Sequence, residues 1–153
     1  MRLKVGDTLP RFSATDTNGN LFEIDSILGK KPFVIYFYPK DNTMGCTAQA
    51  CSFRDQYQDF VDLGAEVIGI SSDSVVSHQK FTNQYKLPFI LLSDKNQKIR
   101  NTFGVPSGML GLIPGRVTYV IDKKGIVKMI FDSSLMPTKH IAKAIEAIKK
   151  LIL

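Results

Sequence analysis

The sequence predicts an α/β domain in which a mixed central sheet is flanked by helices. Residues 33–38 are continuously apolar and residues 66–71 nearly so, as expected of strands covered on both faces. The stretches that follow each of them carry apolar residues every three or four positions, as on the buried face of a helix. A chain in which strands and helices alternate in this way forms an α/β structure.

The size and composition indicate one globular domain spanning residues 1–153. A chain of 153 residues can bury a single core, and 44% hydrophobic with 22% charged residues is typical of a soluble protein. The longest apolar run, 33–38, is too short to cross a bilayer. The first residues lack the apolar core of a signal peptide. We therefore expect a cytoplasmic protein, or a plastid protein if a transit segment has been removed.

The charge pattern gives little indication of a macromolecular partner. The net charge of +6 comes from scattered lysines, several of them in the last 15 residues, and no basic run is interleaved with aromatic residues. We expect these lysines to be a solvated surface. The sequence therefore predicts a protein that binds neither nucleic acid nor membrane, and no long exposed apolar edge argues against a monomer.

Turn and cap residues divide the chain into elements. Residues 9–12 and 21–24 are expected to form a hairpin around Asn18-Gly19, because both turn residues tolerate positive φ. Pro39 ends the strand 33–38, since proline cannot donate to a ladder. A helix is expected from about Met44 to Leu63, and Gly64 stops it.

The second half of the chain continues the alternation. Ser74 is suited to cap a helix that reaches about Tyr85. A strand (89–92), a polar helix (96–102), a hairpin of two strands (117–121 and 126–131) and a final helix opened by Pro137 are then expected. This order is that of a thioredoxin-like fold with an added N-terminal β-hairpin.

Both cysteines lie at the junction between the strand 33–38 and the helix after it. A thiolate is the reactive form of cysteine, and an unperturbed thiol with a pKa of ~8.5 is mostly protonated at neutral pH. The helix N-terminus stabilises an anion at Cys46. Thr43 stands three residues earlier, so its hydroxyl is expected to accept a hydrogen bond from the Cys46 amide. Arg116 is the candidate cationic partner.

The spacing of the two cysteines predicts a conformational change. Residues five apart on a helix have Cα atoms separated by roughly 8–9 Å, whereas a disulfide needs about 7 Å or less. Cys46 and Cys51 can therefore form a disulfide only if the first turns of the helix unwind.

Simpler interpretations compete with a redox site. Cys46 could be a small buried hydrophobe, as cysteine often is, but the pair at a strand-to-helix junction with Thr43 and Gly45 favours reactivity. A metal is not expected, because the two histidines, His78 and His140, are remote from the cysteines. His78 is given no role, since a lone histidine on a polar helix face is usually solvated or a cap.

The segment from Pro39 to Cys46 resembles the peroxiredoxin signature of proline, three residues, threonine, two residues and cysteine. Cys51 stands where the Q-type peroxiredoxins, the bacterioferritin comigratory protein group, carry their resolving cysteine. The likeness to this group extends to residues 50–55, 64–71, 91–94 and 114–122. Residues 110–115 and 137–141 resemble the plastid and cyanobacterial branch in particular.

This resemblance implies an oxidoreductase of the antioxidant class, a thiol-dependent peroxidase for hydrogen peroxide and organic hydroperoxides without a cofactor. Cys46 would become a sulfenic acid and Cys51 would resolve it as an intramolecular disulfide. Thr43 and Arg116 would orient the peroxide, and Pro39 would shield the site from water. Thioredoxin or a similar dithiol would then reduce the disulfide.

Two features depart from or extend this pattern. The family commonly has proline at the position of Met44, so the first helical turn is expected to be looser here. The apolar residues 109–113 are expected to contribute partly to the core and partly to a pocket for alkyl hydroperoxides.

A non-enzymatic redox sensor stays an alternative function. A disulfide oxidoreductase is less favoured, because such enzymes use a C-x-x-C pair and here four residues intervene.

Overall fold

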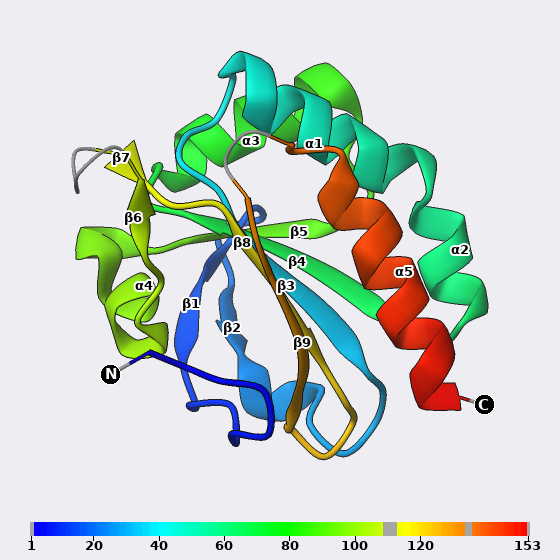
Figure 1. The fold of residues 1–153 in the computed structure, drawn as a ribbon. Coiled ribbons are helices and arrows are strands. Elements are labelled where there is room, and N and C mark those ends of the chain that lie inside the picture. The colour runs from blue at the N-terminus through cyan, green and yellow to red at the C-terminus, as the bar shows by residue number, and fades with distance from the viewer. Residues whose placement is uncertain (1, 109–112, 134–135, 153) are drawn as a thin grey trace.

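The computed structural model describes residues 2–108, 113–133 and 136–152, and its centre is a seven-stranded sheet in the order β2-β1-β5-β4-β3-β8-β9 (Figure 1). The strands of this sheet are β1 (Ser13–Asp16), β2 (Leu21–Glu23), β3 (Phe33–Phe37), β4 (Glu66–Ser71), β5 (Ile90–Ser93), β8 (Val117–Ile121) and β9 (Val127–Asp132). The helices are α1 (Met44–Asp55), α2 (Tyr57–Asp62), α3 (Val75–Tyr85), α4 (Lys98–Phe103) and α5 (Lys139–Ile152). Two short 3₁₀ turns, η1 (Ile24–Ser26) and η2 (Lys95–Gln97), complete the main elements.

The sheet is mixed, as the sequence predicts. Strands β3, β4 and β5 run parallel, while β1 pairs antiparallel with β5 and β8 pairs antiparallel with β3. The predicted N-terminal hairpin is present, because β1 and β2 pair antiparallel across a turn in which Gly19 has a φ of +82°. Gly64 also ends its helix in the left-handed region, with a φ of +75°.

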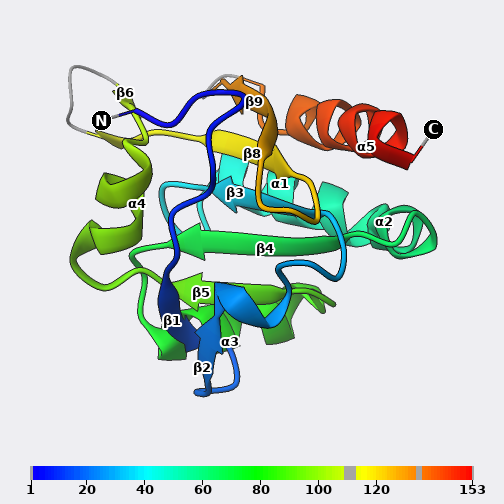
Figure 2. The same cartoon turned by 90° about the horizontal axis from the view of Figure 1, so that it is seen from below.

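Alternate residues of the central strands serve two separate cores. Val34 and Tyr36 of β3 pack in a cluster with buried residues of α1, α2, α3 and α5. Phe33, Ile35 and Phe37 point to the other face, where α4 and the N-terminal segment cover them. Figures 1 and 2 show these two layers on either side of the sheet. Coverage on both faces explains why residues 33–38 lack polar alternation.

Several predicted bounds are wrong. The first hairpin strand begins at Ser13 and not at residue 9, because Thr8 bridges to Ile126 and the Leu9 amide donates to the Gly125 carbonyl. The helix predicted over 44–63 is two helices, since Gln56 leaves the helical region with φ −109° and ψ 11°. The strand predicted over 89–92 is β5, one residue later, and α5 begins two residues after Pro137.

A small two-stranded ribbon, which the sequence pattern does not predict, lies apart from the main sheet. Strands β6 (Ser107–Gly108) and β7 (Ile113–Pro114) pair antiparallel. The apolar loop 109–113 was expected to contribute partly to the core and partly to a substrate pocket, and its residues 109–112 lie outside the described residues. Among the described helices, none combines the length and the apolar character that a membrane span requires.

Candidate active site

The site forms where β3 ends and α1 begins. Thr43 has the extended backbone of an N-cap residue, with φ −82° and ψ 157°, and α1 starts at Met44. Cys46 is therefore in the first turn, where backbone amides lack helical partners and favour an anion. Its side chain is only 1% exposed. The helix brings a buried sulfur to the end of the sheet.

Arg116 reaches this sulfur from the position just before β8. The antiparallel register places Phe37 of β3 opposite Val117 of β8, so Arg116 lies level with the start of the loop after β3. Its Nη2 donates to Cys46 Sγ over 3.4 Å, and the residue is 5% exposed. The contact places a fixed positive charge and a hydrogen-bond donor beside the sulfur.

Gly45 leaves room for this arginine. A Cβ at position 45 would lie 3.0 Å from Arg116 Nη2 and 3.7 Å from Pro137 Cγ. Any side chain there would press on the guanidinium that contacts Cys46. The glycine in the signature segment is therefore explained by a close approach and not by a turn.

The cap expected from Thr43 is absent. Thr43 is an exposed N-cap residue without a side-chain cap bond, and its hydroxyl donates to the Lys40 carbonyl over 3.1 Å. The prediction that this hydroxyl accepts from the Cys46 amide is wrong, because the side chain is turned back along its own loop. Pro39 is half-buried at the end of β3.

Cys51 lies in the same unbroken helix as Cys46. Both thiols are free, Cys46 buried and Cys51 half-exposed, and both belong to α1. Helix geometry keeps their Cα atoms roughly 8–9 Å apart, beyond the reach of a disulfide. In this state the helix separates the two thiols.

Two further residues support the site and were missed from the sequence. Gln49 is fully buried one turn after Cys46, and its Oε1 accepts a hydrogen bond from Arg116 Nη1. Arg100 of α4 donates to the carbonyls of Gly115 (2.8 Å) and Tyr38 (3.1 Å). Gln49 could have been found from the sequence, because it lies on the same helical face as Cys46. Nothing in the polar stretch 96–102 indicated the role of Arg100.

His140 supports the segment formed by Arg116 and the start of β8. Its Nε2 donates to the Ser133 carbonyl (2.8 Å), and its Nδ1 lies 2.7 Å from the Thr118 hydroxyl. The Ser133 amide in turn donates to the Arg116 carbonyl (3.3 Å). Burial lowers the pKa of His140 to about 4, so the ring is neutral and Nδ1 accepts from Thr118.

His78 is not the solvated or capping residue that its polar helix face predicts. It is 0% exposed, and its ring nitrogens face the Asp41 carboxylate (2.7 Å) and the Leu92 carbonyl (3.0 Å). The prediction failed because α3 packs this otherwise polar face on β5 and on the loop before α1. Ser74 does cap α3, as expected, by accepting from the Ser77 amide.

This cluster also contains the kind of atoms that bind a metal. Donor atoms of Asp41, Asp73 and His78 lie within 4.8 Å of one another. However, Asp41 already accepts from the hydroxyls of Tyr38 and Ser77, and Asp73 accepts from the Asp41 amide. These bonds use the carboxylates for internal hydrogen bonding, so the arrangement suits a polar network better than a cation site.

Comparison with known proteins agrees with this geometry. Residues 5–130 match the AhpC/TSA family. The chain is 48% identical over 146 residues to the chloroplastic peroxiredoxin Q of Sedum lineare, covering 95% of this chain and 78% of that protein. It superposes on peroxidoxin BcpB of Mycobacterium tuberculosis with a TM-score of 0.90 and 34% identity, covering 98% and 99% of the two chains. A bacterioferritin comigratory protein of Xanthomonas campestris, described for its alkyl peroxide reduction activity, superposes with a TM-score of 0.83 and 27% identity over 94% and 98%.

The chain belongs to the AhpC/TSA family and, within it, to the peroxiredoxin Q group. The predicted thioredoxin-like fold is confirmed by these neighbours. So is the predicted activity: the protein is a thiol-dependent peroxidase. Peroxides as substrates and a thioredoxin-type reductant follow from the family.

Proposed function

We propose that Cys46 is the peroxidatic cysteine of this peroxidase and Cys51 its resolving cysteine. The observation that carries the assignment is the contact between Cys46 Sγ and Arg116 Nη2 at the start of α1. A buried sulfur between a guanidinium and free helix amides meets the requirements of a stabilised thiolate nucleophile. Cys51 lacks both features, because it is half-exposed in the middle of α1.

The reaction proceeds in three steps. The Cys46 thiolate attacks one peroxide oxygen, the O–O bond breaks, and the departing oxygen takes a proton to leave as water or an alcohol. Cys46 is then a sulfenic acid. The Cys51 thiolate attacks that sulfur, forming the disulfide and releasing the hydroxyl, which takes a proton, as water. A dithiol protein returns both cysteines to thiols by exchange.

The first step depends on residues that hold the peroxide and the sulfur. We assign Arg116 to stabilise the thiolate and the transferring oxygen, with Gln49 fixing its guanidinium. Thr43 is proposed to orient the peroxide at the helix N-terminus, although its hydroxyl is turned to Lys40 in this state. Pro39, half-buried at the end of β3, is proposed to limit the access of water.

The second step requires α1 to unwind. The two thiols share a continuous helix whose geometry keeps them apart. The first turn of α1 is weakly packed, because Met44 is 91% exposed and contributes few contacts. We therefore propose that oxidation of Cys46 is followed by local unfolding of the first turns of α1.

Substrate, reductant, assembly and location are proposed more broadly. We propose organic hydroperoxides as substrates beside hydrogen peroxide, because the Xanthomonas relative is described for alkyl peroxide reduction. Thioredoxin or a similar dithiol is the proposed reductant. We propose a monomer, because the exposed large apolar side chains of the described residues are scattered over different elements. The location is proposed as cytoplasmic, or plastid as for the Sedum relative.

Thioredoxin-coupled peroxide consumption by the wild type and two single variants tests the assignment. Cys46→Ser should be inactive, because no other thiol is held against Arg116. Cys51→Ser should lose thioredoxin-driven turnover but still form a sulfenic acid that a dione reagent traps at Cys46. Full activity of Cys46→Ser would show that the peroxidatic residue has been misassigned.

A further inference from the structure

A buried hydrogen-bond network joins α3 to the loop that precedes Cys46. Its centre is the Asp41 carboxylate, which accepts from the hydroxyls of Tyr38 (2.6 Å) and Ser77 (2.8 Å) and lies 2.7 Å from His78 Nδ1. Asp41 is 5% exposed and His78 is fully buried. Burial and the nearby Asp41 raise the pKa of Tyr38 well above its ordinary value, so its phenol keeps the proton that it donates.

The partners of the His78 ring determine where its protons are. Nε2 lies 3.0 Å from the Leu92 carbonyl, which has no hydrogen to donate, so Nε2 carries one. Nδ1 lies 2.7 Å from an oxygen of the Asp41 carboxyl group, and two atoms that both lack a hydrogen would not approach so closely, so a proton lies between them. His140 differs at this atom, because its Nδ1 faces the Thr118 hydroxyl, which can donate. His78 thus shares a proton with Asp41, whereas His140 accepts a hydrogen bond from Thr118.

The loop held by this network is also tied to the ends of two strands. Asn42 turns the chain in the left-handed region, with a φ of +61°, which asparagine tolerates better than most residues. Just before it, the Asp41 amide donates to Asp73 Oδ2 over 2.8 Å. Asp73 is tied to the ends of β4 and β5, through bonds from Ser71 (2.7 Å) and Ser93 (2.6 Å). Asn42 leads directly into Thr43, the N-cap of α1.

We propose that His78 and Asp41 form an ionic clamp that fixes the loop before α1, keeps Cys46 against Arg116 in the reduced enzyme and opposes the unwinding of the first turns of α1. The clamp rests on the proposed function of Cys46. His78 is a positioning residue in this proposal, because it acts through Asp41 and the loop 40–43. The same contacts that activate the thiol would then oppose disulfide formation.

The kinetic test separates the two chemical steps by rapid quench and mass spectrometry. His78→Gln should slow sulfenic acid formation about tenfold or more, because small displacements of reacting groups are costly, without slowing disulfide closure. Ser77→Ala, which removes one bond to Asp41, should act in the same direction more weakly. Val127→Ala, a truncation in the other core cluster, is the control and should change neither rate by more than about twofold. An unchanged oxidation rate in His78→Gln, or an equal fall in both rates, would overturn the clamp.

The charged pair has its own test. Nitrogen NMR of the wild type at neutral pH should show both ring nitrogens of His78 protonated and only one of His140. In Asp41→Asn the His78 ring should lose one proton. A neutral His78 ring in the wild type would overturn the ionic pair. If the wild type forms no sulfenic acid at Cys46, the proposed function fails, whereas this spectrum still decides the state of His78.

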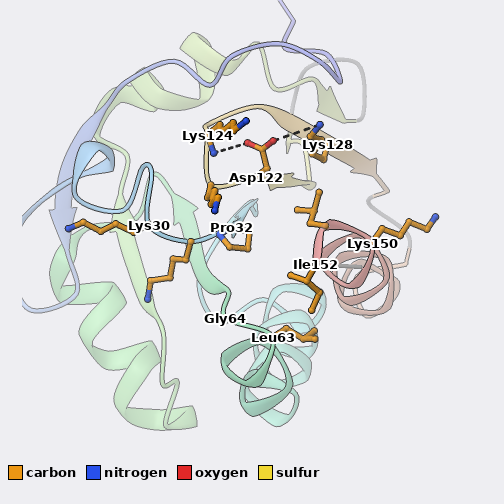
Figure 3. A pocket seen from close by; sticks show the side chains of 12 residues that line it. Lys30, Pro32, Leu63, Gly64, Asp122, Lys124, Lys128, Lys150 and Ile152 are labelled. Carbon is orange, nitrogen blue, oxygen red and sulfur yellow. Dashed lines mark hydrogen bonds and ion pairs between the residues drawn. The ribbon is translucent and has the colours of Figure 1, made fainter.

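A second inference concerns a pocket at the opposite end of the sheet. The pocket has a volume of about 580 Å³ and lies beside Pro32, at the start of β3, whereas Cys46 is beyond the end of that strand. Figure 3 shows Pro32 near the middle of the residues that line it, Leu63 at one edge, and the side chains of Lys30 and Lys150 extending outward at either side. The lysines that line the pocket are Lys30, Lys31, Lys123, Lys124, Lys128 and Lys150.

Most of the excess charge of the chain is collected there. Six of its 20 basic residues and one of its 14 acidic residues, Asp122, line the pocket, which gives a formal +5 against +6 for the whole chain. Lys128 pairs with Asp122 (3.7 Å), and Lys31 and Lys150 pair with glutamates outside the pocket. In the described part of the chain, Lys30, Lys123 and Lys124 have no ion-pair partner. A concave surface that carries charges of one sign raises the local concentration of counter-ions.

We propose that this pocket binds a nucleoside polyphosphate. Lysine ammonium groups bind phosphate as point charges, and a single negative charge would balance only one of the three lysines that have no ion-pair partner among the described residues. The apolar wall formed by Pro32, Leu63, Leu151 and Ile152 offers a surface for the base. The volume is in the range of small-molecule sites, roughly 300–1,000 Å³.

Calorimetric titration of the whole protein with ATP, tripolyphosphate and adenosine tests this. Tripolyphosphate should bind saturably, ATP more tightly, and adenosine not measurably. Lys30→Glu with Lys124→Glu should weaken ATP binding about tenfold or more, whereas Lys80→Glu with Lys98→Glu, an equal charge change on exposed parts of α3 and α4, should not. Equal loss in both double variants, binding only to anionic lipid vesicles, or no saturation at millimolar concentration would overturn the proposal.

Discussion

Acid should destabilise the protein through His140 before its carboxylates are fully protonated. Burial holds the pKa of His140 at about 4, against 6.5 for an ordinary histidine. The unfolded chain therefore binds a proton below pH 6.5 that the folded chain resists, so stability is complete above pH 6.5 and falls as the pH drops toward 4. Linkage over this interval gives a loss of about 2 kcal/mol at pH 5 and about 3 kcal/mol at pH 4.

Urea unfolding of the wild type and of His140→Gln at pH 7 and pH 5 measures the contribution of His140 to the free energy of unfolding. Other groups titrate over the same interval, but they are shared by both proteins, so the difference between the two isolates His140. The variant is expected to be less stable at pH 7, because Thr118 and Ser133 lose partners, and to lose about 2 kcal/mol less than the wild type at pH 5. Equal losses in both proteins would refute a buried neutral His140.

Three further substitutions test the packing around Cys46. Gly45→Ala should keep or raise stability, since alanine favours helix by up to about 1 kcal/mol, yet slow peroxide reduction because its Cβ presses on Arg116; unchanged activity in a coupled assay would contradict this. Tyr36→Phe should raise stability by about 1 kcal/mol in urea unfolding, because the buried Tyr36 hydroxyl has no hydrogen-bond partner among the described residues, and a loss would mean that the hydroxyl is satisfied. Met44→Pro should slow disulfide closure relative to sulfenic acid formation, because proline fits the first helical position and Thr43 already has the extended backbone that precedes proline; equal or faster closure in stopped-flow measurements would count against it.

The sequence was most informative where one local pattern decides the structure. Strand β4 and strand β8 were predicted at both ends, because a short apolar run with turn residues on each side has few alternatives. The Ser74 cap and the Gly64 stop follow from the chemistry of single residues. The break at Gln56 has no such signal, since neither glycine nor proline stands there.

The candidate site was predictable in its cysteines but not in its supporting contacts. Cys46 and Cys51 are close in sequence, so helix geometry alone defines their relation. Arg116 was proposed from its residue type and the resemblance, and the structure brings it to the sulfur through the β3–β8 register. His78 was misjudged, because its partners Asp41 and Leu92 are 37 and 14 residues away and meet it only when α3 packs on β5.

Hydrogen exchange of α1 before and after oxidation tests most directly whether the helix both activates Cys46 and must unwind for Cys51. In the reduced protein the amides of residues 48–52, which follow the first turn, should be protected. After one equivalent of peroxide, with the Cys46–Cys51 disulfide confirmed by mass spectrometry, these amides should lose protection and regain it on reduction, and Cys51→Ser should keep its protection throughout. A wild-type protein that forms this disulfide while α1 stays protected would contradict the proposed unwinding.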